Sequence, residues 1–511
     1  MRGVLVFSFL MFCGVASGQI IDFPDAKFKN ALVNSKCVDT DNDWNGDSDV
    51  DLNNDGEIDV DEAMKVTNLD VAQNQISSLE GIGNFRNLKT LNCSSNSLQS
   101  LNVSELKNLE KFFCTFNQLK SLDVDDLVNL KNLSCSYNQL TTLAFNNLRY
   151  LEHIYCVENQ LTTLTLNNLP NLLALDCEKN QLSSLNIEQL QNLSSFNCNN
   201  NKITTLDIAS LKNLSSLHCS NNQLKSLEID SLKNLVLLYC DYNQLDTLNV
   251  SALTQLRVLS CENNKIQELD IKNLIHLDRL VCSHNQIRTL EVSSLHNLEV
   301  LKCGENQITV LNLDSLVNLQ YLHCYQNKIK SLNVDNLDTL RELACFLNDL
   351  TSLKVVGLKD LKELNCSDNK LKSLKVKDLP NLSSLSCGAN KLLSLDVKNM
   401  DSLAYINCYN NKLISLSLSG LNNLVYLNCY HNDLFTLDVS SLPKLENIDF
   451  GWNKIESLYI NNGYKFSEIS MENNSILSYI CCNKEDVKTV KQSLKNYSIQ
   501  NCKIETKCSS Q

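Results

Sequence analysis

The 21 residues from Leu130 to Tyr150 read LKNLSCSYNQLTTLAFNNLRY, and this pattern returns along most of the chain. Asparagine recurs every 21 residues from Asn96 to Asn474, at 19 positions in register, and Asn74 precedes this series by 22 residues. Cysteine stands three residues before the asparagine in 17 successive repeats, Cys93 to Cys429. A fixed period of this length predicts a repeat architecture in which each coil is one structural unit.

The spacing inside one repeat predicts how each coil is built. In L-x-x-L-x-C, Leu133 and Cys135 lie two residues apart and therefore share one face of a strand. The chain then turns at Asn138, whose side-chain amide is suited to bonding buried backbone groups. The next segment repeats the apolar spacing and predicts a second inward-facing wall. Since one coil cannot bury its faces alone, about 20 coils are expected to stack into one core.

The core motif, L-x-x-L-x-C-x-x-N-x-L, is similar to that of leucine-rich repeats. The chain resembles secreted bacterial leucine-rich-repeat proteins with nested 21-residue repeats and, more distantly, internalin-like adhesins. The resemblance covers about Ile21 to Cys508 and includes FPDAKFKNAL at Phe23–Leu32 and GEIDVDEA at Gly56–Ala63. It implies a leucine-rich-repeat solenoid, either an α/β-class horseshoe or a right-handed β-rich superhelix. A parallel sheet on the concave face, short convex strands or irregular segments, and caps at both ends are expected.

The two ends of the chain differ from the repeats. Residues 1–18 combine Arg2, an apolar run and a small-residue cleavage site, which is the pattern of a secretory signal peptide. No later stretch reaches the ~20 apolar residues of a spanning helix. Relatives often end in a sorting domain, and none is recognised before Gln511, so we expect a secreted protein and leave cell-surface association open. The predicted parts are a signal peptide (1–18), an N-terminal cap (19–66), the solenoid (67–480) and a C-terminal cap (481–511).

The column of 17 cysteines is predicted to be structural. In-register parallel strands hold neighbouring side chains ~4.8 Å apart, farther than the ~3.8 Å mean Cβ separation of a disulfide. Thiols aligned side by side also cannot converge on one zinc ion. We therefore expect buried thiols that act as small hydrophobes in a tight coil, with a metal or redox role as the alternative.

Four further cysteines lie near the C-terminus. One or two disulfides are expected from Cys481 or Cys482 to Cys502 or Cys508, with the connectivity left open, because exported proteins commonly form such bridges. A helical stretch near residues 485–496 is predicted to help close the last coil, whose apolar face would otherwise meet water. The partner of Cys37 is also left open.

An acidic loop near the N-terminus has the spacing of a calcium-binding loop. Side-chain oxygens fall at positions 1, 3, 5, 9 and 12, a carbonyl at position 7, and glycine at position 6. This predicts a structural Ca²⁺ site, and a solvated acidic turn is the alternative. Upstream, Asp39, Asp41 and Asp43 begin a similar spacing, but Trp44 takes the glycine position. The predicted ligands are Asp51, Asn53, Asp55, Glu57, Asp59 and Glu62.

Aromatic residues concentrate at positions predicted to face outward from the main strands. Four such positions per coil hold ten of the 15 tyrosines and five of the seven histidines. Strand preference explains part of this excess, but exposed tyrosines also favour a binding surface. The densest group comprises Tyr405, Tyr409, Tyr426, Tyr430, His431 and Trp452. A second group comprises Tyr321, His323 and Tyr325 with Phe346.

Charge and motifs narrow the function. Fifty-eight acidic and 45 basic residues give a net charge of −13, and without a basic cluster this argues against nucleic-acid binding. The sequence has no G-x-S-x-G, H-E-x-x-H or phosphate-binding glycine loop, so an enzyme is not favoured. We expect an extracellular scaffold for protein recognition or adhesion through the concave face. A glycan-binding module using the same tyrosines and a passive surface or matrix spacer are the alternatives.

Overall fold

The structure is a computed structural model that describes residues 18–41, 46–466 and 469–508. It divides into two compact units, the first ending at Leu214 and the second beginning at Ser215. Of the predicted signal peptide, only Gly18 lies within the described residues.

The main sheet of the first unit is parallel and built from very short strands. Successive strands are offset by one coil, so that Leu133 lies opposite Ile154. A second pair of parallel strands lies on another wall of the coils. The main strands are β1 (Asn68–Asp70), β2 (Thr90–Asn92), β3 (Lys111–Phe113), β4 (Asn132–Ser134), β6 (His153–Tyr155), β8 (Ala174–Asp176) and β9 (Ser195–Asn197); the second wall has β5 (Thr142–Asn146) and β7 (Thr163–Asn167).

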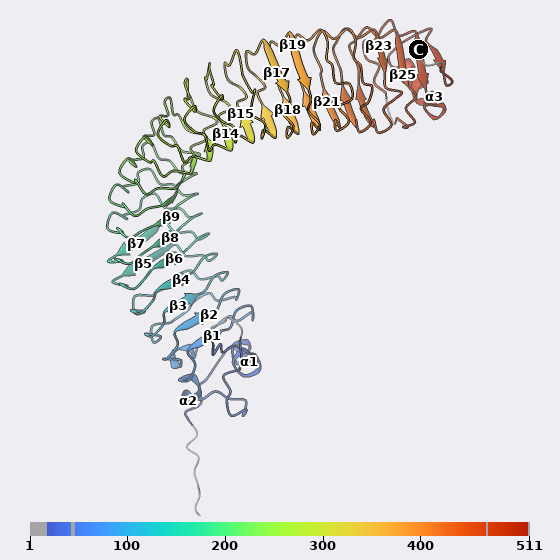
Figure 1. Cartoon of the computed structure of the whole chain (residues 1–511). Helices are drawn as coiled ribbons and strands as arrows, with labels where there is room; N and C mark the ends of the chain where they lie inside the picture. The colour runs from blue at the N-terminus through green and yellow to red at the C-terminus, as the bar shows by residue number, and fades with distance from the viewer. Residues whose placement is uncertain (1–17, 42–45, 467–468, 509–511) are drawn as a thin grey trace, which may run out of the picture. The chain divides into compact units, whose positions relative to one another are not determined.

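The second unit repeats this construction. Figure 1 shows β17 and β19 on the opposite side of the coils from β18 and β21. The second wall has β17 (Ser352–Val356) with β19 (Ser373–Lys377), and a parallel sheet of β23 (Thr436–Asp438), β25 (Ser457–Ile460), β26 (Tyr479–Cys482) and β27 (Lys503–Glu505). The main strands are β10 (Ser216–His218), β11 (Leu237–Tyr239), β12 (Val258–Ser260), β13 (Arg279–Val281), β14 (Val300–Lys302), β15 (Tyr321–His323), β16 (Glu342–Ala344), β18 (Glu363–Asn365), β20 (Ser384–Ser386), β21 (Tyr405–Asn407), β22 (Tyr426–Asn428) and β24 (Asn447–Asp449).

The repeated asparagine bonds each coil to the one before it. The Asn138 amide donates to the carbonyls of Cys114 (3.0 Å) and Cys135 (3.1 Å). Its Oδ1 accepts from the backbone N–H of Leu119 at 3.0 Å. In the second unit Asn411 makes the same bonds to Cys387, Cys408 and Leu392. The ladder satisfies buried backbone groups that the turn would otherwise leave unpaired, as the sequence predicted.

The residue just before each asparagine adopts a left-handed backbone conformation without being glycine. Tyr137 has φ of 56°, and His431 and Trp452 each have φ of 53°. This conformation is unfavourable for most side chains and persists where the surrounding contacts impose it. The asparagine bonds provide those contacts, and the turn they hold determines where the preceding side chain leaves the main sheet.

The thiol column forms part of the core. None of the 17 cysteines from Cys93 to Cys429 is in a disulfide, and all are completely buried. Burial raises the pKa of each thiol whose shift is resolved, to about 12 for Cys135, Cys324 and Cys366. Stacked with the inward leucines, these thiols fill the interior as small apolar groups.

Helices are confined to the ends of the described chain. The first unit has α1 (Ala26–Asn34), the short α2 (Val60–Ala63) and the 3₁₀ turn η1 (Ile82–Asn84). Asp25 caps α1 by accepting from the N–H groups of Lys27 (2.9 Å) and Phe28 (3.1 Å). Its other carboxylate oxygen accepts from the hydroxyl and N–H of Ser77, both at 2.7 Å. One carboxylate thus joins the helix to a coil.

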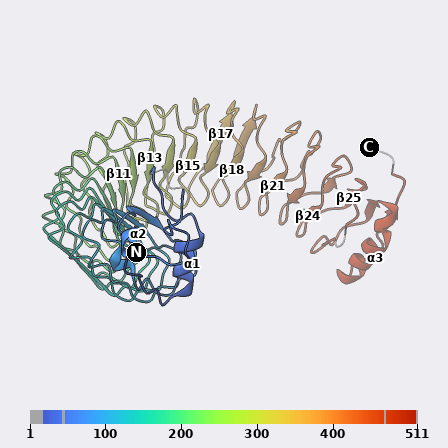
Figure 2. The ribbon, with the colours of Figure 1, turned by 90° about the horizontal axis from the view of Figure 1, so that it is seen from below.

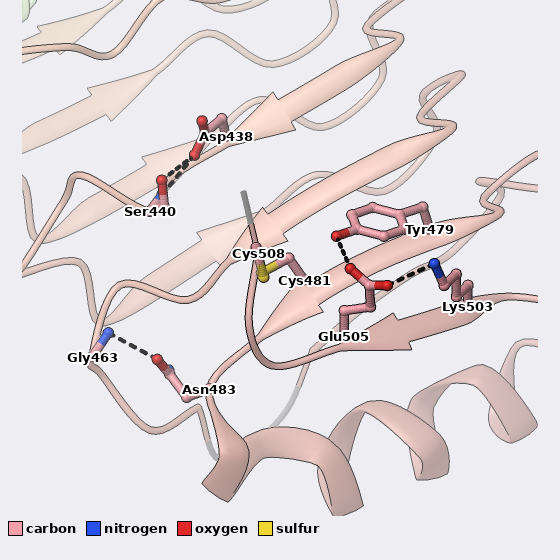
Figure 3. The surroundings of a disulfide bond; sticks show 9 residues. All are labelled: Asp438, Ser440, Gly463, Tyr479, Cys481, Asn483, Lys503, Glu505 and Cys508. Atoms are coloured by element: carbon pink, nitrogen blue, oxygen red, sulfur yellow. Dashed lines mark hydrogen bonds and ion pairs between the residues drawn. A yellow bond between two sulfur atoms is a disulfide. The ribbon is translucent and has the colours of Figure 1, made fainter. Parts of the chain in front are cut away.

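The C-terminal end contains η2 (Lys484–Asp486) and α3 (Val487–Asn496), close to the helix predicted at residues 485–496. Figures 1 and 2 both show α3 beside β25. The strand β27 pairs with β26, and Cys481 is bonded to Cys508 (Figure 3). Glu505 accepts from the Tyr479 hydroxyl at 2.9 Å and pairs with Lys503 at 2.6 Å. Among the described residues, no helix has the length and apolarity needed to cross a membrane.

The disulfide is one of the pairings that the sequence left open. The other two candidates are thiols in the structure: Cys482 is buried, and Cys502 is partly exposed. Cys37, whose partner was also left open, is a buried free thiol. Parallel strands, in-register coils and little helix confirm the leucine-rich-repeat solenoid as the architecture of each unit.

Candidate functional site

The predicted binding residues lie on the main-sheet face of the second unit. We name Tyr405, Tyr409, Tyr426, Tyr430, His431 and Trp452 the aromatic patch. Its strands β21, β22 and β24 are consecutive neighbours in the main sheet, with Tyr405 directly opposite Tyr426 and Tyr426 opposite Asn447. The patch tyrosines are half-buried, whereas His431 and Trp452 are exposed. The repeat therefore brings together, on three coils, residues that are up to 47 positions apart in the chain.

The centre of the patch is a stacked pair. The Tyr405 and Tyr426 rings lie 4.5 Å apart with an interplanar angle of 5°. Beside them, the buried Oδ1 of Asn407 has no hydrogen-bond partner among the described residues. A buried acceptor without a donor is unfavourable by roughly 1–3 kcal/mol. Burial, followed by the neighbouring Tyr405, raises the pKa of Tyr426, so this phenol stays neutral at physiological pH.

A second set of ring contacts within the patch joins Tyr430, His431 and Trp452. The His431 and Trp452 rings lie 5.7 Å apart, and each lies 6.2 to 6.5 Å from the Tyr430 ring. All three side chains leave the sheet at or just before the left-handed turn. The result is a cluster of tilted rings with Trp452 44% exposed.

Tyr409 lies apart from the other rings and over a glycine. A Cβ added to Gly388, at the equivalent position one coil earlier, would lie 2.2 Å from two carbons of the Tyr409 ring. The Tyr409 hydroxyl reaches Asp368 at 3.5 Å, and burial together with this carboxylate raises the pKa of the phenol. Gly388 thus allows the ring to lie flat across the preceding coil.

The second predicted group is built in a similar way. Tyr325 stacks on Phe346 with ring centroids 4.7 Å apart and planes 2° from parallel, and it covers Gly304. His323 Nε2 lies 2.9 Å from Glu342 Oε1 on the next strand. Among the described residues, Tyr321 makes no ring contact. This group is therefore a narrower stack bordered by a histidine–carboxylate pair.

Sequence reasoning missed an apolar stripe that shares two of its three coils with the patch. Leu393, Ile414 and Phe435 occupy equivalent positions in three consecutive coils and are 60%, 58% and 52% exposed. The residues at this position in the earlier coils, Gln99 to Lys372, are all polar. The change from polar to apolar residues over three repeats could have been found in the sequence. Single exposed apolar residues are ordinary, but an aligned set of them indicates an interaction surface.

The acidic loop folds as a tight turn that leads into α2. Asp51 accepts from the N–H groups of Asp55 (3.1 Å) and Gly56 (2.8 Å), and Gly56 has φ of 84°. Glu62 reaches back to accept from Leu52 at 2.9 Å. The side chains of three other predicted ligands each accept from a nearby backbone N–H: Asn53 from that of Asp55, Asp55 from that of Glu57, and Asp59 from that of Glu62. The Glu57 carboxylate pairs with Lys29.

Two carboxylates of this loop are unusual for an acidic turn. Asp51 and Glu62 are each only 4% exposed, and neither forms an ion pair with any described residue. Buried charges in proteins are generally paired or coordinated to a metal. The acidic side chains of the loop do not converge to within 4.8 Å in groups of three; among described residues that arrangement is found at Asp39, Asp41 and Asp47. Asp43 and Trp44 lie outside the described residues.

Comparison with known proteins identifies the fold. A scan against protein-family models gave no match, and a search of the curated proteins gave none. Solved structures of similar fold include the functional domain of InlJ from Listeria monocytogenes, described as containing a cysteine ladder (23% identity, TM-score 0.53, 89% of this chain and 84% of that chain). They also include YopM from Yersinia enterocolitica (24% identity, TM-score 0.61, 86% of this chain and 92% of that chain). The plant peptide hormone receptor RGFR1, solved in complex with RGF2, is a third (18% identity, TM-score 0.61, 84% of this chain and 87% of that chain). These similarities show that the chain has a leucine-rich-repeat fold.

Proposed function

We propose that this protein is a non-catalytic extracellular scaffold that binds a protein partner, in recognition or adhesion, through the main-sheet face of its second unit. The observation that carries the proposal is the aromatic patch. Tyrosine and tryptophan dominate the energetics of protein interfaces because they combine large apolar area with a polar tip. The Tyr405–Tyr426 stack is assembled before any partner arrives, which lowers the entropy lost on binding.

Two further features support a protein as the partner. The stripe of Leu393, Ile414 and Phe435 overlaps the patch on two coils and adds apolar area outside the main-sheet face. RGFR1, which has the same fold, is a peptide hormone receptor solved with RGF2 bound. A glycan-binding module using the patch tyrosines and a passive spacer are the competing functions.

The proposed extracellular location rests on the signal-like residues 1–18 and on the Cys481–Cys508 disulfide. Disulfides persist mainly in oxidising compartments. The 17 buried thiols are compatible with that setting because they are shielded from solvent, and burial raises the pKa of thiols such as Cys135, Cys324 and Cys366.

A capture experiment tests this function. Immobilised protein is exposed to cell-surface protein extracts and, separately, to soluble polysaccharides. The variant Y405S/Y409S/Y426S/Y430S should fold normally but lose the captured protein. The matched control Y137S/Y155S, which removes exposed tyrosines from the first unit, should retain it. Loss of a bound polysaccharide instead would favour the glycan-binding module, and no binding to either would favour the spacer.

We also propose that the loop from Asp51 to Glu62 binds one structural Ca²⁺ ion. Its donors are all oxygens, the ligands that Ca²⁺ prefers, and two of them are buried carboxylates without a cationic partner. Calcium should raise the melting temperature relative to the protein in chelator. Asp55→Asn, which keeps the geometry of the turn but removes a charge, should weaken Ca²⁺ binding in calorimetric titration. Equal melting temperatures with calcium and with chelator would contradict the site.

A further inference from the structure

One edge of the first unit carries a second, exposed ladder of asparagines, which we name the edge ladder. Each amide donates to the carbonyl 22 residues earlier: Asn108 to Arg86 at 3.0 Å, Asn129 to Lys107 at 2.9 Å and Asn171 to Arg149 at 2.8 Å. Asn87 makes the corresponding bond to Met64, and Asn192 the one to Pro170. The ladder ties the edges of consecutive coils together.

Tyr150 interrupts this ladder. It occupies the position between Asn129 and Asn171, where its ring replaces the amide that would have bonded the carbonyl of Val128. Tyr150 is 50% exposed, and its hydroxyl makes no hydrogen bond with any described residue. The substitution gives up a hydrogen bond that the neighbouring coils make and places an exposed aromatic ring in its stead. The replacement of asparagine by tyrosine at this position is therefore not explained by the stability of the coil.

Two open cavities flank the ring. One has a volume of about 680 Å³ and the other about 440 Å³, and Tyr150 lines both. Asn87, Asn108 and Asn129 line the first, and Asn168, Asn171 and Gln189 the second. The amide oxygens of these five asparagines accept no hydrogen bond from the described residues, so they are available to a ligand.

The lining of these cavities is basic although the chain carries a net charge of −13. The two linings together contain one carboxylate, that of Glu110, and four cationic side chains: Lys65, Lys89, Lys131 and Arg149. Glu110 pairs with Lys131 at 2.7 Å and with Lys89 at 3.9 Å. Lys65 and Arg149 form no ion pair with any described residue, and they lie in different cavities on the two sides of the ring. Their charge is therefore available to an anionic ligand.

We propose that Tyr150 is the stacking platform of a binding site for an acidic oligosaccharide, such as a short uronic-acid chain. One sugar ring lies on the exposed aromatic face, and its hydroxyls bond the amides, which both donate and accept. Carboxylates of the neighbouring sugars pair with Lys65 and Arg149. The site is independent of the aromatic patch, because it lies on the edge of the other unit.

The polar lining favours a sugar over an acidic peptide. Protein segments are anchored by apolar side chains that fill buried pockets. Here the exposed ring is surrounded by planar amides and cations, with Leu169, Pro170 and Met64 as the only apolar residues among the other described lining residues. An acidic peptide nevertheless has the same charge, and the experiment must separate the two.

The test uses the full chain and three probes in calorimetric titration: hexagalacturonate, the neutral maltohexaose and a deca-glutamate peptide. Tyr150→Asn restores the edge ladder, so the variant should fold at least as well as the parent while losing the platform. We expect hexagalacturonate to bind the parent and Tyr150→Phe, and to bind Tyr150→Asn about tenfold more weakly, the order expected for loss of one aromatic contact. Tyr405→Asn, on the other unit, serves as the matched control and should leave binding unchanged.

Charge is tested in the same way. Arg149→Gln should weaken hexagalacturonate binding and reduce its dependence on salt concentration. Deca-glutamate binding as tightly as the sugar, or equal affinity of Tyr150→Asn and the parent, would overturn the proposal. Binding of maltohexaose as tight as that of hexagalacturonate would overturn the acidic specificity, and no binding of either sugar would overturn the site.

Discussion

The rings of Tyr405 and Tyr426 stack across neighbouring strands with their centroids 4.5 Å apart and their planes 5° from parallel. The two residues are direct partners in the parallel register, so the 21-residue period of the chain itself places one ring on the other. A partner that binds here meets a rigid aromatic surface.

We predict that Tyr426→Ser lowers affinity for the captured partner by about 2 kcal/mol or more, roughly thirtyfold, as expected for an interface hot spot. Tyr426→Phe keeps the stack and should lose much less. The stability of the fold should change by no more than about 1.5 kcal/mol, because the stacked pair is on the surface. Surface plasmon resonance with the purified partner gives the affinities. Equal affinity of Tyr426→Ser and the parent would remove the patch from the interface.

A second prediction concerns Gly388. An alanine there places its Cβ within 2.2 Å of the Tyr409 ring, so the ring must move off the preceding coil. Partner affinity should fall about as much in Gly388→Ala as in Tyr409→Ala, although no aromatic residue has been removed. Ser367→Ala, at the same position one coil earlier, is the control and should bind normally. An unchanged affinity in Gly388→Ala would show that the orientation of Tyr409 has no role.

The two asparagine ladders should differ sharply in their contribution to stability. Asn138→Ala leaves the buried groups of Cys114, Cys135 and Leu119 without partners and should destabilise the first unit by about 3 kcal/mol or more. Asn129→Ala, at the end of the preceding coil, removes one exposed bond to Lys107 and should cost less than about 1 kcal/mol. Denaturant unfolding and hydrogen exchange of the surrounding coils measure both. Similar losses in the two variants would contradict the role assigned to the inner ladder.

The thiol column predicts a loss of stability in alkaline solution. Burial raises the pKa of thiols such as Cys135 from an ordinary value of 9.0 to about 12, whereas the unfolded chain ionises near pH 9. The unfolded state therefore binds fewer protons between these values. Stability is complete below about pH 9 and falls as the pH rises toward 12, by about 1.4 kcal/mol per pH unit for each thiol exposed on unfolding.

Urea unfolding under reducing conditions at several pH values measures this slope. Cys282→Ala, which removes one buried thiol, should flatten it by the share of a single group. A native thiol titration should detect little besides Cys502 among the described cysteines, and the 20 described cysteines outside the disulfide should all react after denaturation. A low count in denaturant would mean that the column is oxidised or bound to metal.

The disulfide predicts a local effect at the C-terminal end. Cys481 and Cys508 are 27 residues apart, and the chain-entropy model assigns a loop of this length about 3.5 kcal/mol. Cys508→Ser should release β27 and expose α3 to limited proteolysis. Cys502→Ser removes a cysteine that is not in the disulfide and should leave the proteolysis pattern of the parent. Identical patterns in both variants would indicate that strand pairing alone holds this end.

How far the sequence predicted the site depends on the kind of contact. The period placed Tyr405 beside Tyr426, because equivalent positions on adjacent coils must meet. It did not predict that Tyr409 lies across Gly388, or that Asn407 keeps an unpaired oxygen, because these depend on side-chain rotamers and on the space left by the next coil. The acidic side chains of Asp39, Asp41 and Asp47 converge, at positions 1, 3 and 9 of the upstream spacing in which Trp44 takes the glycine position, whereas those of the complete loop do not.

The sequence by itself determined the coil: its length, its inward leucine and cysteine positions, and the asparagine that closes each turn. These features are local and repeated, so covalent spacing and the need to bury apolar faces decide them. Only the tertiary structure decided which of the four C-terminal cysteines pair, and that Tyr150 stands alone where its neighbours form a ladder. Both depend on contacts between coils or beyond the repeats, which no single period encodes.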